Sequence, residues 1–309
     1  MSKVKAAPDD VITRLNDIIK NLKFGERFFL RNIVITPVYL QIDLSEKKDF
    51  LTLDESIEKK YSIKIRDISD INKVEIENNT DRNLFVMDGE QLTGGLQNRM
   101  FVHSFVLEPQ RRNNYNVYCI ESGRWDGNTR VFNTQRDLSY TKVRLLNLIS
   151  TRTKKKTAQD TIWKEIEKKS QTLNYYSKTS SLTDLNRYMD RVVEDYIENY
   201  EYSNENGYLV QHEDNIVSFE ILNENSIVKK LYKKMLKSYI YDAIGIEEDR
   251  LQRIKKLENE TENLRVKTFR QAENEQEFHI FNNRLEGKFY TYRDGVFHLS
   301  LFNNRKITK

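Results

Sequence analysis

The sequence is short of cysteine and of long hydrophobic runs. Its 309 residues include one cysteine, Cys119, which excludes a disulfide framework and a zinc site built from several cysteines. No stretch approaches the roughly 18 apolar residues of a membrane-spanning helix, and the opening MSKVKAAPDD lacks the apolar core of a secretory signal. With a mean hydropathy of −0.74, these absences predict a soluble, intracellular, cytoplasmic protein without a membrane partner.

An excess of charge of one sign is also missing. The chain has 51 lysines and arginines against 47 aspartates and glutamates, which gives a formal net charge of +4. A balance this close does not favour a nucleic acid as the partner. The lysines at 229–230 and 233–234 are expected on a solvated helix face.

Glycine is scarce and unevenly placed. It makes up 10 of the 309 residues, about 3% against about 7% in typical proteins. Half of these glycines fall between positions 89 and 127. This crowding directs attention to one short region of the chain.

The pattern of apolar residues predicts an α+β protein with an antiparallel, β-rich N-terminal half. Residues 9–23 have helical spacing, and residues 28–121 are rich in β-branched and aromatic residues bounded by Asn, Asp and Gly. A short helix is expected at 53–60, with Asp54 as its cap. Strand runs followed by helix runs favour α+β over a βαβ sheet.

The second half is predicted to be mainly helical, with two hairpins. Helical spacing occurs in residues 137–150, 158–173, 181–200 and 226–244. Ser181 and Asp184 are expected as N-terminal capping residues of the third of these helices. Strand patterns predict one hairpin over 207–222, joined at Asp214-Asn215, and a closing hairpin over 284–302 that turns at Asp294-Gly295.

These elements suggest a division into four parts. They are an N-terminal helix (1–23), a core domain (24–246) containing the helical segment 137–200, a long charged helix (247–277), and a C-terminal β-hairpin (278–302) that packs back on the core. The charged helix has only a loose apolar stripe, too short for a coiled coil. It is a candidate surface for a protein partner or for self-association.

The first candidate site is a polar, glycine-rich segment between two apolar strands. It reads GEQLTGGLQNR over residues 89–99 and includes Glu90, Gln97, Asn98 and Arg99. Glycine permits positive φ and close approach of a ligand to the backbone, and loops on rigid strands often carry binding residues. The alternative is a bulged turn with solvated polar side chains. A phosphate-binding P-loop is excluded, because no Gly-Lys-Ser/Thr follows and no helix is predicted there.

The second candidate site is YCIESGRWDG, residues 118–127. Cys119 and Glu121 are expected on one face of a strand, because strand side chains alternate. Arg124 and Trp125 then follow at the strand end, where the guanidinium can bind a phosphate or carboxylate and the indole can stack on a base. The alternative is a buried ion pair beside a core tryptophan.

Two carboxylates in these segments, Glu90 and Glu121, form a candidate pair for general acid/base catalysis or for binding a divalent cation. His103 and Cys119 extend the pair to a weak transition-metal set, because the chain has no H-x-H or H-E-x-x-H motif. Cys119 is expected to be a small buried residue rather than a nucleophile.

Motifs over most of the chain match one known family pattern. The most specific are Gly-Glu-x-Leu-x-Gly-Gly-x-Gln-Asn-Arg at 89–99 and Val-x-Cys-x-Glu-x-Gly-Arg-Trp at 117–125. The others are NIVITPVYLQ (32–41), FLTLDESI (50–57), Gln159 with Trp163, Leu236 to Ala243, and Val296 to Phe302. On these residues, from about 24 to 302, the chain resembles the ARG-and-Rhodanese-Phosphatase-superfamily-associated protein domain family. It departs from the family pattern near Arg66-Asp67, where the family tends to carry a glutamate.

The resemblance implies a biological context but no specific reaction. The family is named for neighbouring genes of ADP-ribosylglycohydrolases and rhodanese-phosphatases, which implies metabolism of ADP-ribose, NAD or a related nucleotide, within NAD metabolism or phage defence. The leading hypothesis is therefore a protein that binds or processes such a nucleotide. Its expected ligand-binding residues are Gly94, Gly95, Gln97, Asn98, Arg99, Arg124 and Trp125, and its expected acid/base or cation-binding residues are Glu90 and Glu121.

Two other hypotheses remain open at this point. In the first, the protein is a non-enzymatic partner or scaffold of an associated enzyme, the polar residues form a buried network, and the 247–277 helix docks the partner. In the second, it is a defence effector that acts on RNA or DNA, which requires a basic groove.

Overall fold

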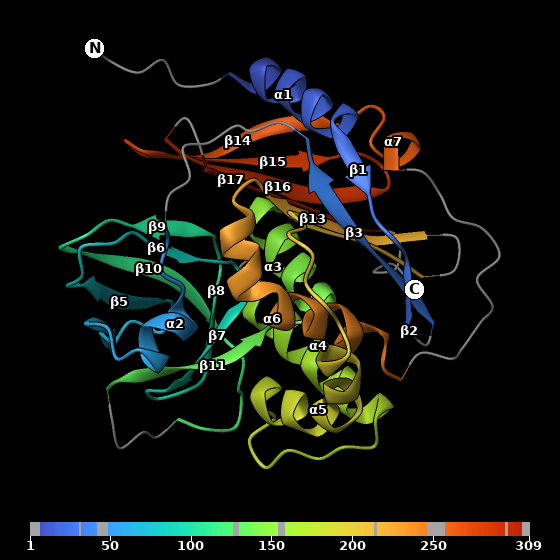
Figure 1. Cartoon of the computed structure of the whole chain (residues 1–309). Helices are drawn as coiled ribbons and strands as arrows, with labels where there is room; N and C mark the ends of the chain where they lie inside the picture. The colour runs from blue at the N-terminus through green and yellow to red at the C-terminus, as the bar shows by residue number, and fades with distance from the viewer. Residues whose placement is uncertain are drawn as a thin grey trace. The chain divides into compact units, whose positions relative to one another are not determined.

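A computed structural model of the chain describes residues 7–30, 32–41, 49–125, 130–153, 158–212, 215–245, 257–293 and 296–304. It confirms the α+β class, with helices and antiparallel sheets (Figure 1). The chain divides into two compact units. Unit 1 comprises residues 1–48, 203–228 and 248–309, and unit 2 comprises residues 49–202 and 229–247. This division differs from the predicted one, in which a single core ran from 24 to 246.

Unit 1 is built on one antiparallel sheet in the order β1-β3-β12-β13-β17-β16-β15-β14, with β2 also paired to β3. Its strands are β1 (Leu22–Phe24), β2 (Phe28–Leu30), β3 (Ile33–Leu40), β12 (Gly207–His212), β13 (Asn215–Leu222), β14 (Arg265–Gln271), β15 (Glu275–Phe281), β16 (Leu285–Tyr292) and β17 (Val296–Asn303). Helix α1 (Pro8–Lys20) lies along this sheet (Figure 1) and buries Val11, Leu15 and Ile18 in its core. The two predicted hairpins are present as β12–β13 and β16–β17. Residues 213–214 and 294–295, which include three of the four predicted turn residues, lie outside the described part.

The long charged helix predicted for 247–277 is wrong where the structure describes it. Only Leu257–Glu260 is helical (α7), and residues 265–271 and 275–281 are the paired strands β14 and β15. Strand β14 is at the edge of its sheet, where charged side chains are favoured because they discourage pairing with another chain. Because β14 carries several charged residues, its sequence resembles an exposed helix, and the strand was not predicted. Residues 246–256 lie outside the described part.

Unit 2 contains a sheet in the order β11-β7-β8-β10-β5-β4 and the pair β6–β9. Its strands are β4 (Ile63–Asp67), β5 (Lys73–Asn78), β6 (Leu84–Val86), β7 (Glu90–Gly94), β8 (Arg99–Phe101), β9 (Phe105–Leu107), β10 (Arg111–Cys119) and β11 (Phe132–Leu138). Its helices are α2 (Leu53–Glu58), α3 (Thr141–Thr153), α4 (Ala158–Thr172), α5 (Leu182–Glu198) and α6 (Asn225–Ala243) from Lys229 onward. Figure 1 shows α3 to α6 gathered beside this sheet. No helix among the described residues is long and apolar enough to cross a membrane.

The helix caps agree only in part with the predicted ones, since Ser181 is at the expected N-cap position but Asp54 and Asp184 are not caps. Thr52, not Asp54, caps α2 by accepting a hydrogen bond from the Glu55 backbone N–H at 3.4 Å, and Asp54 is left free to pair elsewhere. Ser181 occupies the N-cap position of α5 without a side-chain capping bond. Asp184 instead accepts a hydrogen bond from Ser177 at 2.8 Å.

Candidate functional site

Two of the three glycines of the first motif lie at the tight turn between β7 and β8. Gly94 and Gly95 have φ angles of +111° and +54°, in the region that favours glycine. A Cβ at Gly94 would lie 2.7 Å from the Val131 carbonyl oxygen, and one at Gly95 would strike the Phe132 ring. The glycines are therefore required for close packing of the turn against β11.

The polar residues that follow this turn are buried, so the predicted alternative of a solvated turn is wrong. Gln97 and Arg99 are at most 1% exposed and Asn98 is 9% exposed. Strand pairing of Arg99 with Cys119 brings the first motif against the second. The two motifs thus form one structure, which we call the motif network and define as residues 94–99 with 119–124.

Glu121 lies at the centre of the motif network and is 4% exposed. Its carboxylate accepts hydrogen bonds from the Asn98 backbone N–H (3.0 Å), from Thr179 Oγ1 (2.7 Å), and from Nε (3.1 Å) and Nη2 (2.9 Å) of Arg124. Burial alone would raise the pKa of Glu121, but these bonds and the charge of Arg124 outweigh it and hold the pKa below its usual value. Glu121 is therefore an ionised, fully bonded carboxylate.

Both arginines expected to hold phosphate are engaged by the protein. Arg124 Nη1 donates to the Gly95 carbonyl oxygen at 3.0 Å, and Nη2 donates to Asn98 Oδ1 at 3.2 Å. Arg99 Nη1 donates to Gln97 Oε1 at 3.1 Å and contacts the Cys119 sulfur. Neither guanidinium points a free fork at solvent, so the ion-pair alternative describes Arg124 better than the phosphate-binding expectation does.

Trp125 is the exception within the second motif. Its side chain is 58% exposed, so the alternative of a core tryptophan is wrong. It directly follows the rigidly bonded Arg124 at the end of the motif. Of the predicted ligand-binding side chains, Trp125 is the one that the structure presents to solvent.

Cys119 is buried, as expected, and burial raises the pKa of its thiol. Its backbone N–H and C=O both bond the side-chain amide of Gln159 on α4, at 2.8 and 2.6 Å. Gln159 is one of the family-like residues, and its role here is to tie α4 to the end of β10.

Glu90 has an environment of its own. It is 1% exposed, with Oε1 accepting from the Met87 backbone N–H at 3.3 Å and Oε2 lying 3.6 Å from Lys234 Nζ. Lys234 in turn lies 2.7 Å from Asp54. Burial raises the pKa of Glu90 to about 7, with Asp54 adding to the rise and Lys234 opposing it.

Asp137 extends this group, which we call the Lys234 cluster and define as Asp54, Glu90, Asp137 and Lys234. Burial and the nearby Asp190 raise the pKa of Asp137 to about 6, and the charges of Lys237 and Lys234 oppose this rise. Lys234 is only 4% exposed, so the expectation of a solvated lysine face is wrong at this position. The sequence analysis did not predict Lys234, Asp54 and Asp137 as site residues. One weak signal was the acidic pair Asp54 and Glu55 in FLTLDESI. These two acids pair with Lys234 and Lys230, which lie on successive turns of α6.

The structure does not bring Glu90 and Glu121 together as a pair. Among the described residues they share no hydrogen-bond or ion-pair partner. Within the same part of the chain, no group of three metal-ligating atoms within 4.8 Å includes Glu90, His103, Cys119 or Glu121. The residues present do not fit the expected cation site.

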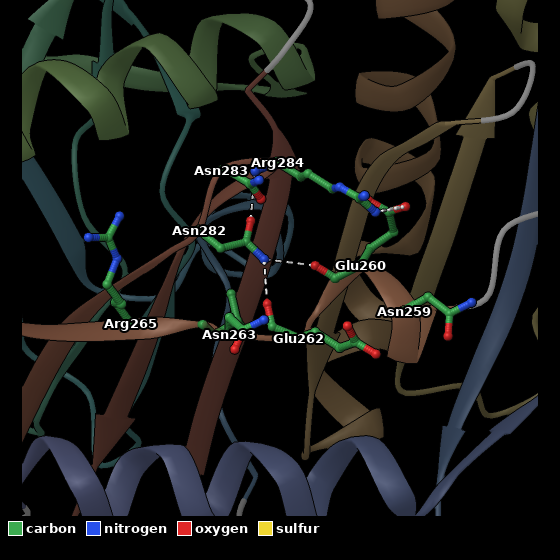
Figure 2. Close-up of a pocket in the computed structure, with 9 residues that line it drawn as sticks. Asn259, Glu260, Glu262, Asn263, Arg265, Asn282, Asn283 and Arg284 are labelled. Atoms are coloured by element: carbon green, nitrogen blue, oxygen red, sulfur yellow. Dashed lines mark hydrogen bonds and ion pairs between the residues drawn. The ribbon is translucent and has the colours of Figure 1, made fainter.

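A polar groove of about 840 Å³ lies elsewhere, in unit 1, next to α7 and the β15–β16 turn (Figure 2). Figure 2 shows Asn282 at its centre, where its amide nitrogen donates to the backbone oxygens of Glu260 (2.9 Å) and Glu262 (3.0 Å). Arg284 donates to the Glu260 carboxylate at 2.9 Å. These bonds hold the turn together, and no predicted site residue lines the groove.

Fold and site together define a two-unit α+β protein with a glycine-turn motif network and a separate buried charge cluster in unit 2. The model of the ARG and Rhodanese-Phosphatase-superfamily-associated Protein domain matches residues 21–302, so the chain belongs to this family. The resemblance seen in the motifs is thereby confirmed. Comparison with curated proteins and with solved structures gives no match.

Proposed function

We propose that the protein binds an ADP-ribose-like or NAD-derived nucleotide on the surface around Trp125, at the end of the motif network. The observation that carries the proposal is the exposure of Trp125, 58%, beside a motif that is otherwise buried and bonded. The family name supports the choice of nucleotide, because it associates the domain with ARG proteins. A role in NAD metabolism or phage defence is part of the same proposal.

The physical basis is stacking on a prepared aromatic surface. An indole ring contributes about 1–3 kcal/mol per stacked base, and it does so best when its backbone is already fixed. Arg124, whose bonds to the Gly95 oxygen and to Glu121 fix the strand end, provides that rigidity. In this proposal the motif network positions Trp125, and Arg99, Gln97 and Asn98 act through the network rather than on the ligand.

The proposal is restricted to binding. Glu121 is ionised and fully bonded, and Glu90 holds its proton near neutral pH in a buried place that shares no partner with Glu121. A pair that acts as general acid and base must reach the same substrate atoms. The geometry therefore supports recognition of a nucleotide better than its turnover.

Isothermal titration with ADP-ribose, NAD and cyclic derivatives tests the proposal. The chain has two tryptophans, so Trp163→Phe leaves Trp125 as the sole indole, and we expect its fluorescence to change on binding. Trp125→Ala should abolish most of the affinity at unchanged melting temperature, whereas Phe29→Ala, at an exposed aromatic of unit 1, should not. A folded protein that binds none of these nucleotides would refute the proposal.

A scaffold or partner subunit is the second candidate, and the burial of the motif network favours it. Under this alternative the motif stabilises the fold and binds no ligand. The helix once expected to dock the partner is absent from residues 257–277, where the chain forms α7, β14 and part of β15. Loss of stability in every motif variant, without nucleotide binding by the wild type, would support this candidate.

A further inference from the structure

The loop between α4 and α5 packs directly on the second motif. The Gly123 backbone N–H donates to the Thr179 carbonyl oxygen at 2.9 Å, and Thr179 Oγ1 donates to Glu121 at 2.7 Å. A Cβ at Gly123 would lie 2.9 Å from Thr179 Cα, so glycine is needed for this approach. We call this contact the Gly123–Thr179 clasp.

The loop presents a second exposed aromatic side chain. Tyr176 is 83% exposed, while its neighbour Tyr175 is stacked on Tyr188 with ring centroids 4.6 Å apart. Ser177 is buried and bonded to Asp184, which fixes the backbone between the two tyrosines and the clasp. Tyr176 is thus an exposed ring on an anchored loop, as Trp125 is on an anchored strand end.

The clasp limits how far apart the two aromatic residues can lie. Tyr176 is three residues from Thr179, and Trp125 is two residues from Gly123. At roughly 3.5 Å per extended residue, each backbone lies within roughly 11 Å of its own side of the clasp. Lys178 is exposed and lies between Tyr176 and Thr179 in the chain, so the same loop carries a cation close to the clasp.

We propose that the site extends from Trp125 across the clasp to Tyr176 and takes a dinucleotide, in which two bases are joined through a diphosphate. This inference rests on the nucleotide binding proposed above and specifies the ligand class. Each ring stacks on one base. Lys178 lies near the doubly charged diphosphate, which its ammonium attracts as a point charge.

Titration with NAD and ADP-ribose tests the inference, because the two ligands differ by one base. In the full-length protein we expect NAD to bind at least tenfold more tightly than ADP-ribose. Trp125→Ala should weaken both ligands and Tyr176→Ala should weaken NAD alone, each by about tenfold or more. Lys178→Gln should weaken both ligands less, and its effect should fade with added salt. Phe29→Ala is the matched control and should leave both affinities unchanged.

The outcomes separate this inference from the proposed function. If Trp125→Ala weakens binding and Tyr176→Ala leaves both affinities unchanged, the dinucleotide span is wrong and the nucleotide site at Trp125 stands. If both variants weaken the two ligands equally, the site takes a single base and the span is again wrong. If the folded wild type binds neither ligand, the proposed function and this inference both fail.

Discussion

Two buried glutamates of unit 2, Glu90 and Glu121, have the same side chain, nearly the same burial and opposite electrostatics. Glu121 receives its hydrogen bonds from an arginine, a hydroxyl and a backbone N–H, and its pKa is lowered. Glu90 receives one backbone N–H and shares Lys234 with Asp54, and its pKa is raised to about 7. Burial penalises the charge of both groups, so the hydrogen-bond donors decide which group ionises.

The comparison explains why the two carboxylates do not act as the pair that the sequence suggested. The motif network pairs the negative charge of Glu121 with one guanidinium, whereas in the Lys234 cluster two carboxylates, Asp54 and Glu90, share one buried ammonium. An excess of acids at one site is relieved by holding protons. The first arrangement fixes a loop, and the second makes stability depend on pH.

Lys234→Met should have the largest effect, because it leaves the buried acids of its cluster without their cation. Burial alone would lower the pKa of Lys234, but Glu90 and Asp54 outweigh it and keep the lysine charged. We expect a loss of about 3–5 kcal/mol in unfolding free energy at pH 8, and a smaller loss at pH 5, where Glu90 and Asp137 carry protons. Urea denaturation at pH 8 and at pH 5 measures the two losses.

Lys234→Arg keeps the charge and is the fallback if the methionine variant does not fold. Lys237→Met, on the same helix and 2.7 Å from Asp190, is the matched control with a less buried pair and a smaller expected loss. An equal loss for Lys234→Met and Lys237→Met at pH 8 would contradict the special role of the cluster.

Glu121→Gln should cause the second-largest loss in unfolding free energy. The amide keeps the shape but turns an N–H toward Arg124 and removes the charge that the guanidinium pairs with. We expect a loss of about 2–4 kcal/mol that stays constant between pH 5 and 8. Because the folded pKa of Glu121 is lowered from 4.5, its contribution is present above pH 4.5 and disappears as pH falls through the folded value.

Glu58→Gln is the surface control for this prediction. Glu58 lies 3.2 Å from Arg136 with both side chains at least half exposed, and such pairs contribute about 0–1 kcal/mol. A Glu121→Gln protein no less stable than Glu58→Gln would show that the motif network contributes little to folding.

Glu90→Gln should distinguish the Lys234 cluster from the motif network by the pH dependence of its effect on stability rather than by the size of that effect. The folded pKa of Glu90 lies above its unfolded value of 4.5, so the native state binds the proton more tightly and stability falls as pH rises from 4.5 through 7. Glutamine imitates the protonated form at every pH. Relative to wild type, the variant should be nearly neutral at pH 5 and more stable by about 2–3 kcal/mol at pH 8. An identical difference at the two pH values would refute the raised pKa.

The fold was largely predictable because its signals are local. Alternation in residues such as those of β13 and helical spacing in α5 act within one element, whereas β14 was missed because an edge strand tolerates the charges that also suit an exposed helix. Convergence of the two motifs was predictable from their neighbouring strands. The Lys234 cluster was not, because Asp54, Glu90, Asp137 and Lys234 come from α2, β7, β11 and α6, and only tertiary packing shows that a lysine of an apparently solvated run is buried.

Thr179→Val should have the smallest effect and tests whether hydrogen bonds set the state of Glu121. The substitution keeps the shape and removes one donor, 2.7 Å from the carboxylate, so we expect a loss of about 1–2 kcal/mol at pH 7. The lost donor favoured the ionised form, so the loss should shrink only as the pH falls through the lowered folded pKa of Glu121, where the native carboxylate is protonated. Thr134→Val is the counterpart in the Lys234 cluster, because Thr134 Oγ1 lies 2.8 Å from Asp54. If Thr179→Val costs the same at every pH down to acid unfolding, the threonine contributes packing alone, and Arg124 and the Asn98 backbone N–H account for the ionised state of Glu121.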